Sequence, residues 1–353
     1  SLYPITLTVN GETSTLEVPA NRTLHQLLSE DLHQHSVKSG CYIGECGLCT
    51  VILNGKPVNS CLVFAVEADG AVVESAEAEN GEPGTLSELQ QAFVDHGAIQ
   101  CGFCTPGMLA SARALLKRTP KPTREQIVEA LSGNYCRCTG YLPIIDAVEA
   151  VAKGGYRPKP APTAPYVGGE VNRVDAAAKV TGSAMFVHDM TLDGMLHGRI
   201  LTSPHPSARI KRIDVSKAKA MPGVKAVLTG ADLPYKLGLY MEDKDILARG
   251  VVHHQGEAVA AVAAETWIQA KLATLAIEVE YELMEPVLDV HAALMEGAPQ
   301  VHPDLAGYSW MKGVFFPQPG RNTAHHQKIR KGDVEQGMKQ ADRVFEFQFQ
   351  NPP

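Results

Sequence analysis

The sequence predicts an α+β protein of three folded parts: a small β-rich domain, a bundle of four helices, and a larger region of mixed strands and helices. Three observations support this prediction. Apolar and polar residues alternate near the N-terminus, and apolar residues then recur at helical spacing up to residue 151. A proline-rich stretch follows, and all eight cysteines precede it, between Cys41 and Cys138.

The first part has the plan of a small ferredoxin-like β-grasp domain. Alternating apolar residues predict a β-hairpin over residues 3–18, with Asn10 and Gly11 as its two-residue turn. Thr23 is suited to cap a short helix. Residues 51–53 predict a further strand, so the hydrophobic pattern of this part is that of a small sheet with one covering helix.

The second part shows four apolar stripes at helical spacing, in residues 86–94, 108–116, 127–131 and 144–151. Thr123 and Gln126 have the spacing of a capping box at the start of the third stripe. Thr105 followed by Pro106 predicts an N-cap and a first helical residue. Because the cysteines of this part lie at the ends of the stripes, we expect a small bundle around one metal centre.

The third part begins after a predicted linker, residues 153–170, whose spaced prolines favour an extended polyproline conformation. Strands are predicted at residues 213–215, 259–265 and 277–281, and a helix at residues 266–273. The sequence contains no glycine-rich motif of the G-x-G-x-x-G type, which argues against a built-in Rossmann site for flavin or nicotinamide.

Composition excludes several classes of function. The formal net charge is −7 and no basic stripe is present, so the sequence does not indicate a nucleic-acid partner. No apolar run is long enough to cross a bilayer. The N-terminus lacks the pattern of a secretory signal, and reduced cysteines fit the cytoplasm. A periplasmic location stays open if the N-terminus is processed.

The cysteines form two groups of four, which is the number of thiolates that one 2Fe–2S cluster needs. The first group reads Cys41-x4-Cys46-x2-Cys49-x11-Cys61, and the second reads Cys101-x2-Cys104-x31-Cys136-x1-Cys138. The first group begins with the spacing of plant-type ferredoxins. Gly44 and Gly47 lie inside its loop, where glycine allows positive φ and lets amide groups approach the sulfurs. The spacings therefore favour two 2Fe–2S clusters.

Zinc and disulfides are the alternatives to iron. Cys101 and Cys104, taken alone, suit zinc as well as iron. The single residue between Cys136 and Cys138 argues against a zinc knuckle, whose paired ligands have two to four intervening residues. A disulfide scaffold is typical of short secreted chains and does not suit a 37.9 kDa chain without cysteines in its larger part.

These motifs resemble those of the xanthine oxidase and aldehyde oxidoreductase family of molybdenum hydroxylases. In the first 152 residues the resemblance rests on residues 40–49, 100–107 and 136–141. The later part is similar to the α/β-hammerhead domain that opens the family's molybdenum subunit, through residues 173–182, 203–206, 222–224 and 255–260.

The resemblance implies five segments. They are a plant-ferredoxin-like 2Fe–2S domain (1–76), a helical 2Fe–2S-binding domain (77–152), the proline-rich linker (153–170), an α/β-hammerhead domain (171–300), and the start of a molybdenum-binding region or a partner-contacting tail (301–353).

The resemblance also implies a function. In this family a molybdenum centre on molybdopterin, with or without an attached nucleotide, hydroxylates an aldehyde, a purine or an N-heterocycle. Electrons then leave through an inner 2Fe–2S cluster on Cys101, Cys104, Cys136 and Cys138, and next through an outer one on Cys41, Cys46, Cys49 and Cys61. Gln100 and Cys138 correspond to residues that contact the pterin. The alternative for Gln100 is a helix-terminal polar residue that bonds the backbone.

Two departures from the family pattern shape the expected partners. No flavin domain separates the iron–sulfur part from the hammerhead part, so FAD, where the enzyme uses it, is expected on a separate subunit. The sequence ends near the start of the family's molybdenum-binding domains, so we expect no catalytic residues in this chain. Either a partner subunit carries them, as in a split molybdenum subunit, or this sequence is part of a longer product. The competing hypotheses are a free-standing 2Fe–2S carrier with a binding domain, and a zinc-stabilised interaction module.

Overall fold

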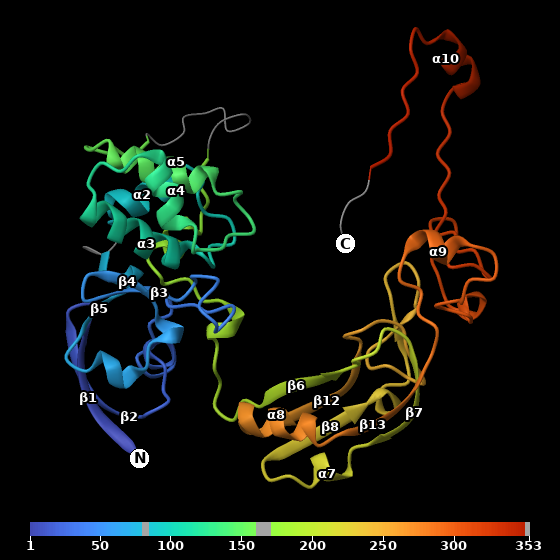
Figure 1. Ribbon diagram of the computed structural model, residues 1–353, viewed down its shortest axis with the longest axis horizontal. Helices are drawn as coiled ribbons and strands as arrows, with labels where there is room; N and C mark the ends of the chain where they lie inside the picture. Colours follow the sequence, from blue (N-terminus) through green and yellow to red (C-terminus); the bar gives the residue numbers. More distant parts are fainter. Residues whose placement is uncertain (80–84, 160–170, 350–353) are drawn as a thin grey trace. The chain divides into compact units, whose positions relative to one another are not determined.

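The computed structural model describes residues 1–79, 85–159 and 171–349. The chain divides into two compact units, Ser1–Met190 and Thr191–Pro353 (Figure 1). No helix within the described ranges has the length and hydropathy that crossing a membrane would require. Most of the predicted linker falls on residues 160–170, outside the described residues.

The N-terminal domain is a five-stranded sheet in the order β2-β1-β5-β3-β4. Its strands are β1 (Leu2–Val9), β2 (Glu12–Pro19), β3 (Thr50–Leu53), β4 (Lys56–Asn59) and β5 (Val72–Glu74). Asn10 and Gly11 both have positive φ, as the tight turn of the β1–β2 hairpin requires. β1 pairs in parallel with β5, and this pairing joins the β1–β2 hairpin to β3 and β4. The predicted hairpin and β-grasp plan are confirmed.

A short helical segment covers this sheet, formed by α1 (Leu24–Gln26) and a π-helical turn (Leu27–Asp31). Thr23 accepts a hydrogen bond from the amide of Gln26 and so caps α1, as its position predicts. The apolar side chains of this segment pack against those of the strands, and the fully buried members include Leu24, Leu27, Leu28, Val51 and Val73. This packing fixes the position of the chain that leads into the first cysteine loop.

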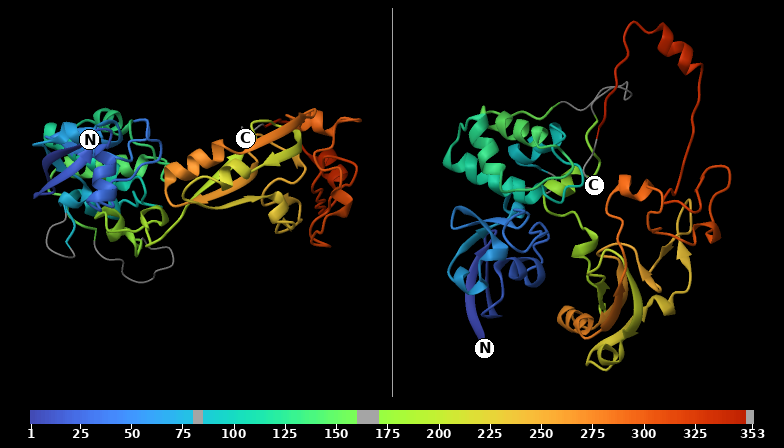
Figure 2. Two further views of the ribbon diagram at one scale, coloured as in Figure 1. Left: turned by 90° about the horizontal axis from the view of Figure 1, so that it is seen from below. Right: turned by 45° about the vertical axis from the view of Figure 1, so that its right-hand side comes forward.

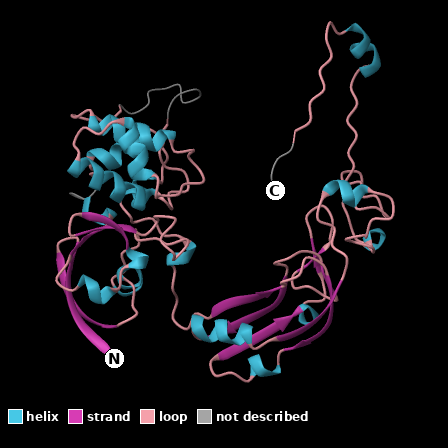
Figure 3. Cartoon of the chain, viewed as in Figure 1, coloured by secondary structure: helices cyan, strands magenta, loops and turns pink. Residues whose placement is uncertain are grey.

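The helical domain contains α2 (Glu88–Asp95), α3 (Thr105–Arg118), α4 (Arg124–Leu131) and α5 (Leu142–Ala152), close to the four predicted stripes (Figure 3). The capping box of Thr123 with Gln126 is present. The predicted start of α3 is wrong by one residue. Cys104 is the N-cap, because its carbonyl already accepts the amide of Met108 at 3.1 Å, and Thr105 is the first helical residue.

Residues 171–190 belong to the first unit, although the sequence boundaries assign them to the hammerhead domain. Helix α6 (Ala176–Val180) buries Ala176 and Val180 in the core of the helical bundle. The side chain of Gln90 donates to the carbonyl of Val180 at 3.2 Å. Because these contacts complete the bundle core, the structure moves the end of the N-terminal unit to residue 190.

The second unit is built on two three-stranded antiparallel sheets, in the orders β6-β12-β8 and β11-β7-β13. The strands are β6 (His197–Thr202), β7 (Ala208–Asp214), β8 (Val224–Thr229), β11 (Val251–Val252), β12 (Ala258–Ala264) and β13 (Glu278–Leu283). Helices α7 (Ser216–Lys219) and α8 (Trp267–Leu275) complete the hydrophobic core, with α8 along β6 and β12 (Figure 2). The predicted strand at residues 213–215 begins earlier, at Ala208, and ends at Asp214.

The remaining elements of this unit are a small hairpin and two short helices. They are β9 (Lys236–Leu237), β10 (Lys244–Asp245), α9 (Val290–Leu294) and α10 (Val334–Gln340). Short 3₁₀ turns occur at Ser60–Leu62, Ala65–Ala68, Ala76–Glu79, Val187–Asp189, Gly230–Asp232 and Leu305–Gly307.

A buried ion pair joins Lys38 of the N-terminal domain to Asp189, near the end of the first unit. The ammonium group of Lys38, which is 1% exposed, bonds the carboxylate of Asp189, and the ring of Phe186 lies 4.8 Å from that ammonium. Removing one partner of a buried pair leaves the other charge without compensation. We therefore expect Lys38→Met to lower the free energy of unfolding by about 3–5 kcal/mol, measured by urea denaturation.

The double variant Lys38→Met/Asp189→Asn should recover part of this loss, since it removes both charges. Lys153→Met serves as the control, because Lys153 pairs with Glu149 on the surface of α5. Equal stability of Lys38→Met and the wild-type protein would contradict the proposed importance of the pair.

Candidate metal centres

The first cysteine group has three members on the loop between the helical segment and β3, and its fourth member, Cys61, follows β4. Cys46, Cys49 and Cys61 are buried, and Cys41 is partly exposed. The amides of Ile43 and Cys46 each donate to the sulfur of Cys41 at 3.4 Å. The bond from Ile43 contributes most to lowering the pKa of Cys41, to about 7. The loop therefore stabilises a thiolate at the sulfur closest to solvent, and a thiolate is the form that binds metal.

The glycines of this loop are required by its path. Gly44 and Gly47 have φ values of +81° and +65°. A Cβ on Gly44 would lie 2.3 Å from Cδ1 of Leu62, and one on Gly47 would lie 2.1 Å from the carbonyl oxygen of Gly133. Any side chain at Gly47 would thus collide with backbone that cannot rotate away. The sequence-based expectation for both glycines agrees with this geometry.

The β3–β4 hairpin brings Cys61 back to the loop. Both the amide and the hydroxyl of Ser60 donate to the carbonyl of Cys49, at 3.2 and 2.7 Å. Burial, together with the neighbouring Cys61, raises the pKa of Cys49 to about 11. A buried thiol pair with a raised pKa becomes a thiolate pair when a cation binds between the sulfurs.

The second group lies at helix ends in the bundle. Cys101 and Cys104 flank the turn that starts α3, and Cys136 and Cys138 lie between α4 and α5. Burial and the charge of Cys136 raise the pKa of Cys104. Burial acts to raise the pKa of Cys136, but hydrogen bonds from Thr139, whose hydroxyl is 3.2 Å from the sulfur, and from Cys138 and Cys104 together leave this pKa lowered. Cys136 therefore favours the thiolate form, whereas the buried Cys104 favours the thiol.

The thiols approach one another in pairs. Cys41 interacts with Cys46, Cys49 with Cys61, Cys101 with Cys138, and Cys104 with Cys136. Over residues 1–79, 85–159 and 171–349, no three His, Cys, Asp or Glu side chains gather closely enough to hold a single metal ion. Two pairs of thiols per group are the donor set of a 2Fe–2S cluster, which holds two irons with two protein ligands each. The residues therefore fit this cofactor at both places.

One hydrogen bond connects the two cysteine groups. The amide of Tyr135 donates to the carbonyl of Cys46 at 2.9 Å, and Tyr135 directly precedes Cys136. Beside it, the amide of the buried Asn134 donates to the carbonyl of Gly47 at 2.7 Å. Sequence reasoning missed Asn134, because its partner lies 87 residues away and no local pattern marks the contact.

The second group is also held by Lys179 of α6. Lys179 donates to the carbonyl of Gln100 at 3.0 Å and to Asp175 at 2.7 Å. Its aliphatic stem fills the space beside Gly102, where a Cβ would lie 2.5 Å from Cδ of Lys179. Gln100 itself is exposed, so its side chain lies at the surface next to Cys101. The sequence motif around Lys179 was assigned to the hammerhead domain, and the structure places it on the cysteine turn instead.

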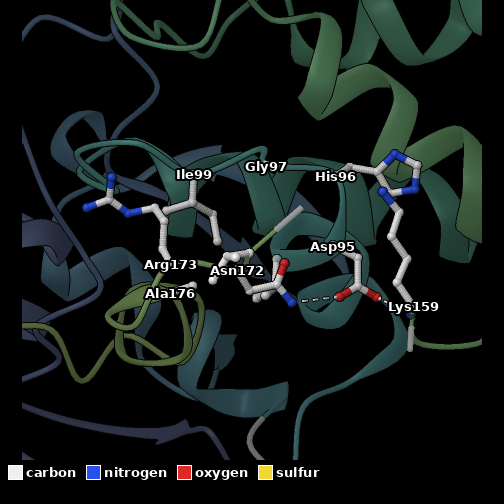
Figure 4. A pocket seen from close by; sticks show the side chains of 10 residues that line it. Asp95, His96, Gly97, Ile99, Lys159, Asn172, Arg173 and Ala176 are labelled. Carbon is white, nitrogen blue, oxygen red and sulfur yellow. Dashed lines mark hydrogen bonds between the residues drawn. The ribbon is translucent and has the colours of Figure 1, made fainter. Parts of the chain in front are cut away.

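A cavity of about 300 Å³ lies next to this turn, lined by residues that include Asp95, Ile99, Asn172 and Arg173 (Figure 4). The carboxylate of Asp95 accepts from the hydroxyl of Tyr156 at 2.9 Å and from the amide of Asn172 at 3.4 Å. Asp95, the last residue of α2, is therefore hydrogen-bonded to both Tyr156 and Asn172.

Both cysteine groups fall within regions that match models of iron–sulfur domains. The 2Fe-2S iron-sulfur cluster binding domain matches residues 7–87, and the [2Fe-2S] binding domain matches residues 73–149. The a/b hammerhead domain of aldehyde oxidase and xanthine dehydrogenase matches residues 181–285. The nicotinate dehydrogenase small FeS subunit of Eubacterium barkeri is 51% identical over 146 residues, which cover 41% of this chain and 91% of that subunit. The chain belongs to the xanthine oxidase and aldehyde oxidoreductase family of molybdenum hydroxylases.

Longer members of this molybdenum hydroxylase family match both units. The aldehyde oxidoreductase of Megalodesulfovibrio gigas is 36% identical over 339 residues, which cover 89% of this chain and 36% of the relative. The solved structure of the aldehyde oxidoreductase from Desulfovibrio gigas superposes with a TM-score of 0.77 at 34% identity, over 85% of this chain and 36% of that one. The chain thus spans about a third of the length of these relatives. The predicted family and fold class are confirmed.

Gly47 offers a direct test of the first metal centre. Gly47→Ala places a Cβ against the carbonyl of Gly133 and strains a positive φ, so the loop has to move. We expect iron to fall from about four atoms to about two per chain, measured by elemental analysis and visible absorption. Gly55→Ala is the matched control, since Gly55 also has positive φ but no atom lies within 4 Å of its Cβ position. Full iron in Gly47→Ala would show that the close contact is not needed.

Proposed function

We propose that this chain is the electron-transfer and scaffold part of a molybdenum hydroxylase. In this proposal Cys101, Cys104, Cys136 and Cys138 hold an inner 2Fe–2S cluster, and Cys41, Cys46, Cys49 and Cys61 hold an outer one. The observation that carries the proposal is the hydrogen bond that the amide of Tyr135, next to Cys136, donates to the carbonyl of Cys46. It joins two complete sets of four thiols through a short covalent and hydrogen-bonded route.

The protein groups around each set support a direction of transfer. When bound, a 2Fe–2S cluster takes up and gives off one electron at a time, and the Mo–pterin centre supplies the two-electron chemistry on the substrate. Cys101 and Cys138 are exposed beside the exposed Gln100, so the inner set can meet a pterin at the protein surface. This exposure supports the proposal that Gln100 and Cys138 contact the pterin.

The outer set lies beneath an exposed apolar surface. Tyr42, Ile43 and Leu62 are each at least 60% exposed, and they lie within two residues of Cys41 or Cys61 in the chain. Tyr42 and Ile43 lie within the cysteine loop itself. An apolar surface directly over a redox centre suits a docking site for an electron acceptor. We therefore propose that electrons leave here, to a flavin subunit or to an external acceptor.

The substrate class follows from the family and from its named members. The relatives are called aldehyde oxidoreductase and nicotinate dehydrogenase, so an aldehyde or an N-heterocycle, purines included, is the proposed substrate. The catalytic residues and most contacts to the molybdopterin are proposed to lie outside residues 1–353. Elemental analysis of the natively purified complex should give about four irons per chain together with molybdenum. Iron without molybdenum would favour a free-standing electron carrier.

The order of transfer is tested by substitution in the complete enzyme. Cys46→Ser should remove the outer cluster only, so substrate should still reduce the inner cluster while acceptor reduction falls to the background rate. The EPR spectrum after substrate addition and the rate of acceptor reduction measure the two steps separately. Cys138→Ser is the comparison, because it should damage the inner cluster and stop both steps. Acceptor reduction at the wild-type rate in Cys46→Ser would overturn the proposed order.

A further inference from the structure

Two buried hydroxyl groups without a hydrogen-bond partner lie beside the cysteine groups. Among the residues that the structure describes, the buried side-chain polar atoms without a partner belong to His25, Ser39, Thr105 and Arg113. Thr105 is 1% exposed and directly follows Cys104. Ser39 is 5% exposed and lies two residues before Cys41. Each cysteine group therefore has one buried hydroxyl of this kind at the edge of its loop.

A hydroxyl in this position is costly unless something accepts its proton. Burying a hydroxyl without a hydrogen bond is unfavourable, and such groups are rare in folded proteins. Threonine and serine at the other helix starts of this chain avoid the cost. The hydroxyls of Thr23, Ser87, Thr123 and Thr266 each accept a hydrogen bond from a backbone amide of the first helical turn.

Thr105 has no such role, because it lies one residue inside α3. The N-cap of that helix is Cys104, which makes no side-chain capping bond. The hydroxyl of Thr105 is thus buried without serving the helix, in the residue that follows Cys104. Ser39 precedes Gly40, whose Cβ position would lie 2.9 Å from Cδ1 of Leu48 and 3.8 Å from the sulfur of Cys46, so this stretch of chain runs close to a cysteine of the first group. A 2Fe–2S cluster bound by either cysteine group would bring sulfur atoms, which accept hydrogen bonds, to these loops.

We propose that the hydroxyl of Thr105 donates a hydrogen bond to a sulfur of the inner cluster, and that the hydroxyl of Ser39 does the same for the outer cluster. Both are positioning residues that set the reduction potential of the cluster they face. This inference rests on the proposed assignment of the two cysteine groups to 2Fe–2S clusters.

The direction of the effect follows from charge. Reduction adds one electron to a cluster already surrounded by four thiolates, so a hydrogen-bond donor to sulfur stabilises the reduced form more than the oxidised form. A donor therefore raises the reduction potential. Removing the hydroxyl at constant side-chain shape should lower the potential of that cluster alone.

The experiment compares Thr105→Val, Thr105→Ser and Ser39→Ala in the iron-loaded enzyme purified with its native partners. Each cluster is titrated with redox mediators and followed by its EPR signal. Thr105→Val should lower the ratio of reduced to oxidised inner cluster about tenfold at a given potential, a shift of about 59 mV for one electron. Thr105→Ser should restore the wild-type value, and Ser39→Ala should shift the outer cluster only.

Two further measurements separate the hydrogen bond from a packing effect. Electron–nuclear double resonance in heavy water should show an exchangeable proton coupled to the inner cluster, absent in Thr105→Val and present in Thr105→Ser. Thr274→Val is the control, because Thr274 is a buried threonine of α8 whose hydroxyl donates to the carbonyl of Lys271 at 2.7 Å. It should move neither potential. If Thr105→Val does not fold, Thr105→Ala is titrated in its place.

The outcomes distinguish this inference from the proposed function. Unchanged potentials in Thr105→Val and Ser39→Ala would overturn the inference, while reduction of both clusters by substrate in the wild-type enzyme would leave the function intact. Shifted potentials, with no reduction of either cluster by substrate in the wild-type enzyme, would support the hydrogen bonds and overturn the electron-transfer function.

Discussion

The close contact between the first cysteine loop and the helical bundle is the constraint on which both metal centres depend. The carbonyl of Gly47 accepts from Asn134, and a Cβ on Gly107 of α3 would lie only 2.5 Å from that same oxygen. Glycine at both positions lets backbone meet backbone, so the loop and the helix approach more closely than side chains would allow. The amide of Tyr135 can then reach Cys46. Two domains of different fold thereby form one compact unit.

The environment differs between the two centres in a way that matches two roles. In the first group three of the four thiols are buried, and backbone amides stabilise the partly exposed Cys41 as a thiolate. In the second group Cys101 and Cys138 are exposed, and Cys104 is buried at the start of α3. A cluster with exposed ligands can contact another cofactor directly, whereas a sheltered one needs a docking surface on the protein. In the proposed function the exposed ligands of the second group suit receiving electrons, and the sheltered first group suits passing them on.

Local features were predictable from the sequence and long-range contacts were not. The hairpin turn at Asn10 and Gly11 and the capping box at Thr123 depend on neighbouring residues, and both appear as expected. Cysteine spacing identified the candidate ligands because the loop has to present four thiols together. Asn134 and Lys179 find their partners 87 and 79 residues away, so no window of sequence contains the contact. The start of α3 was misplaced by one residue because a cysteine occupies the N-cap.

Because α6 is buried in the bundle, the folded iron–sulfur unit extends beyond the boundary of the matched domain family. The matched domain family stops at residue 149, yet Ala176 and Val180 fill the bundle core and Asp189 pairs with Lys38. A recombinant fragment cut at the family boundary would expose apolar surface on α2 and α3 and leave a lysine charge buried alone. Fragments meant for spectroscopy of the two centres should therefore extend through residue 190.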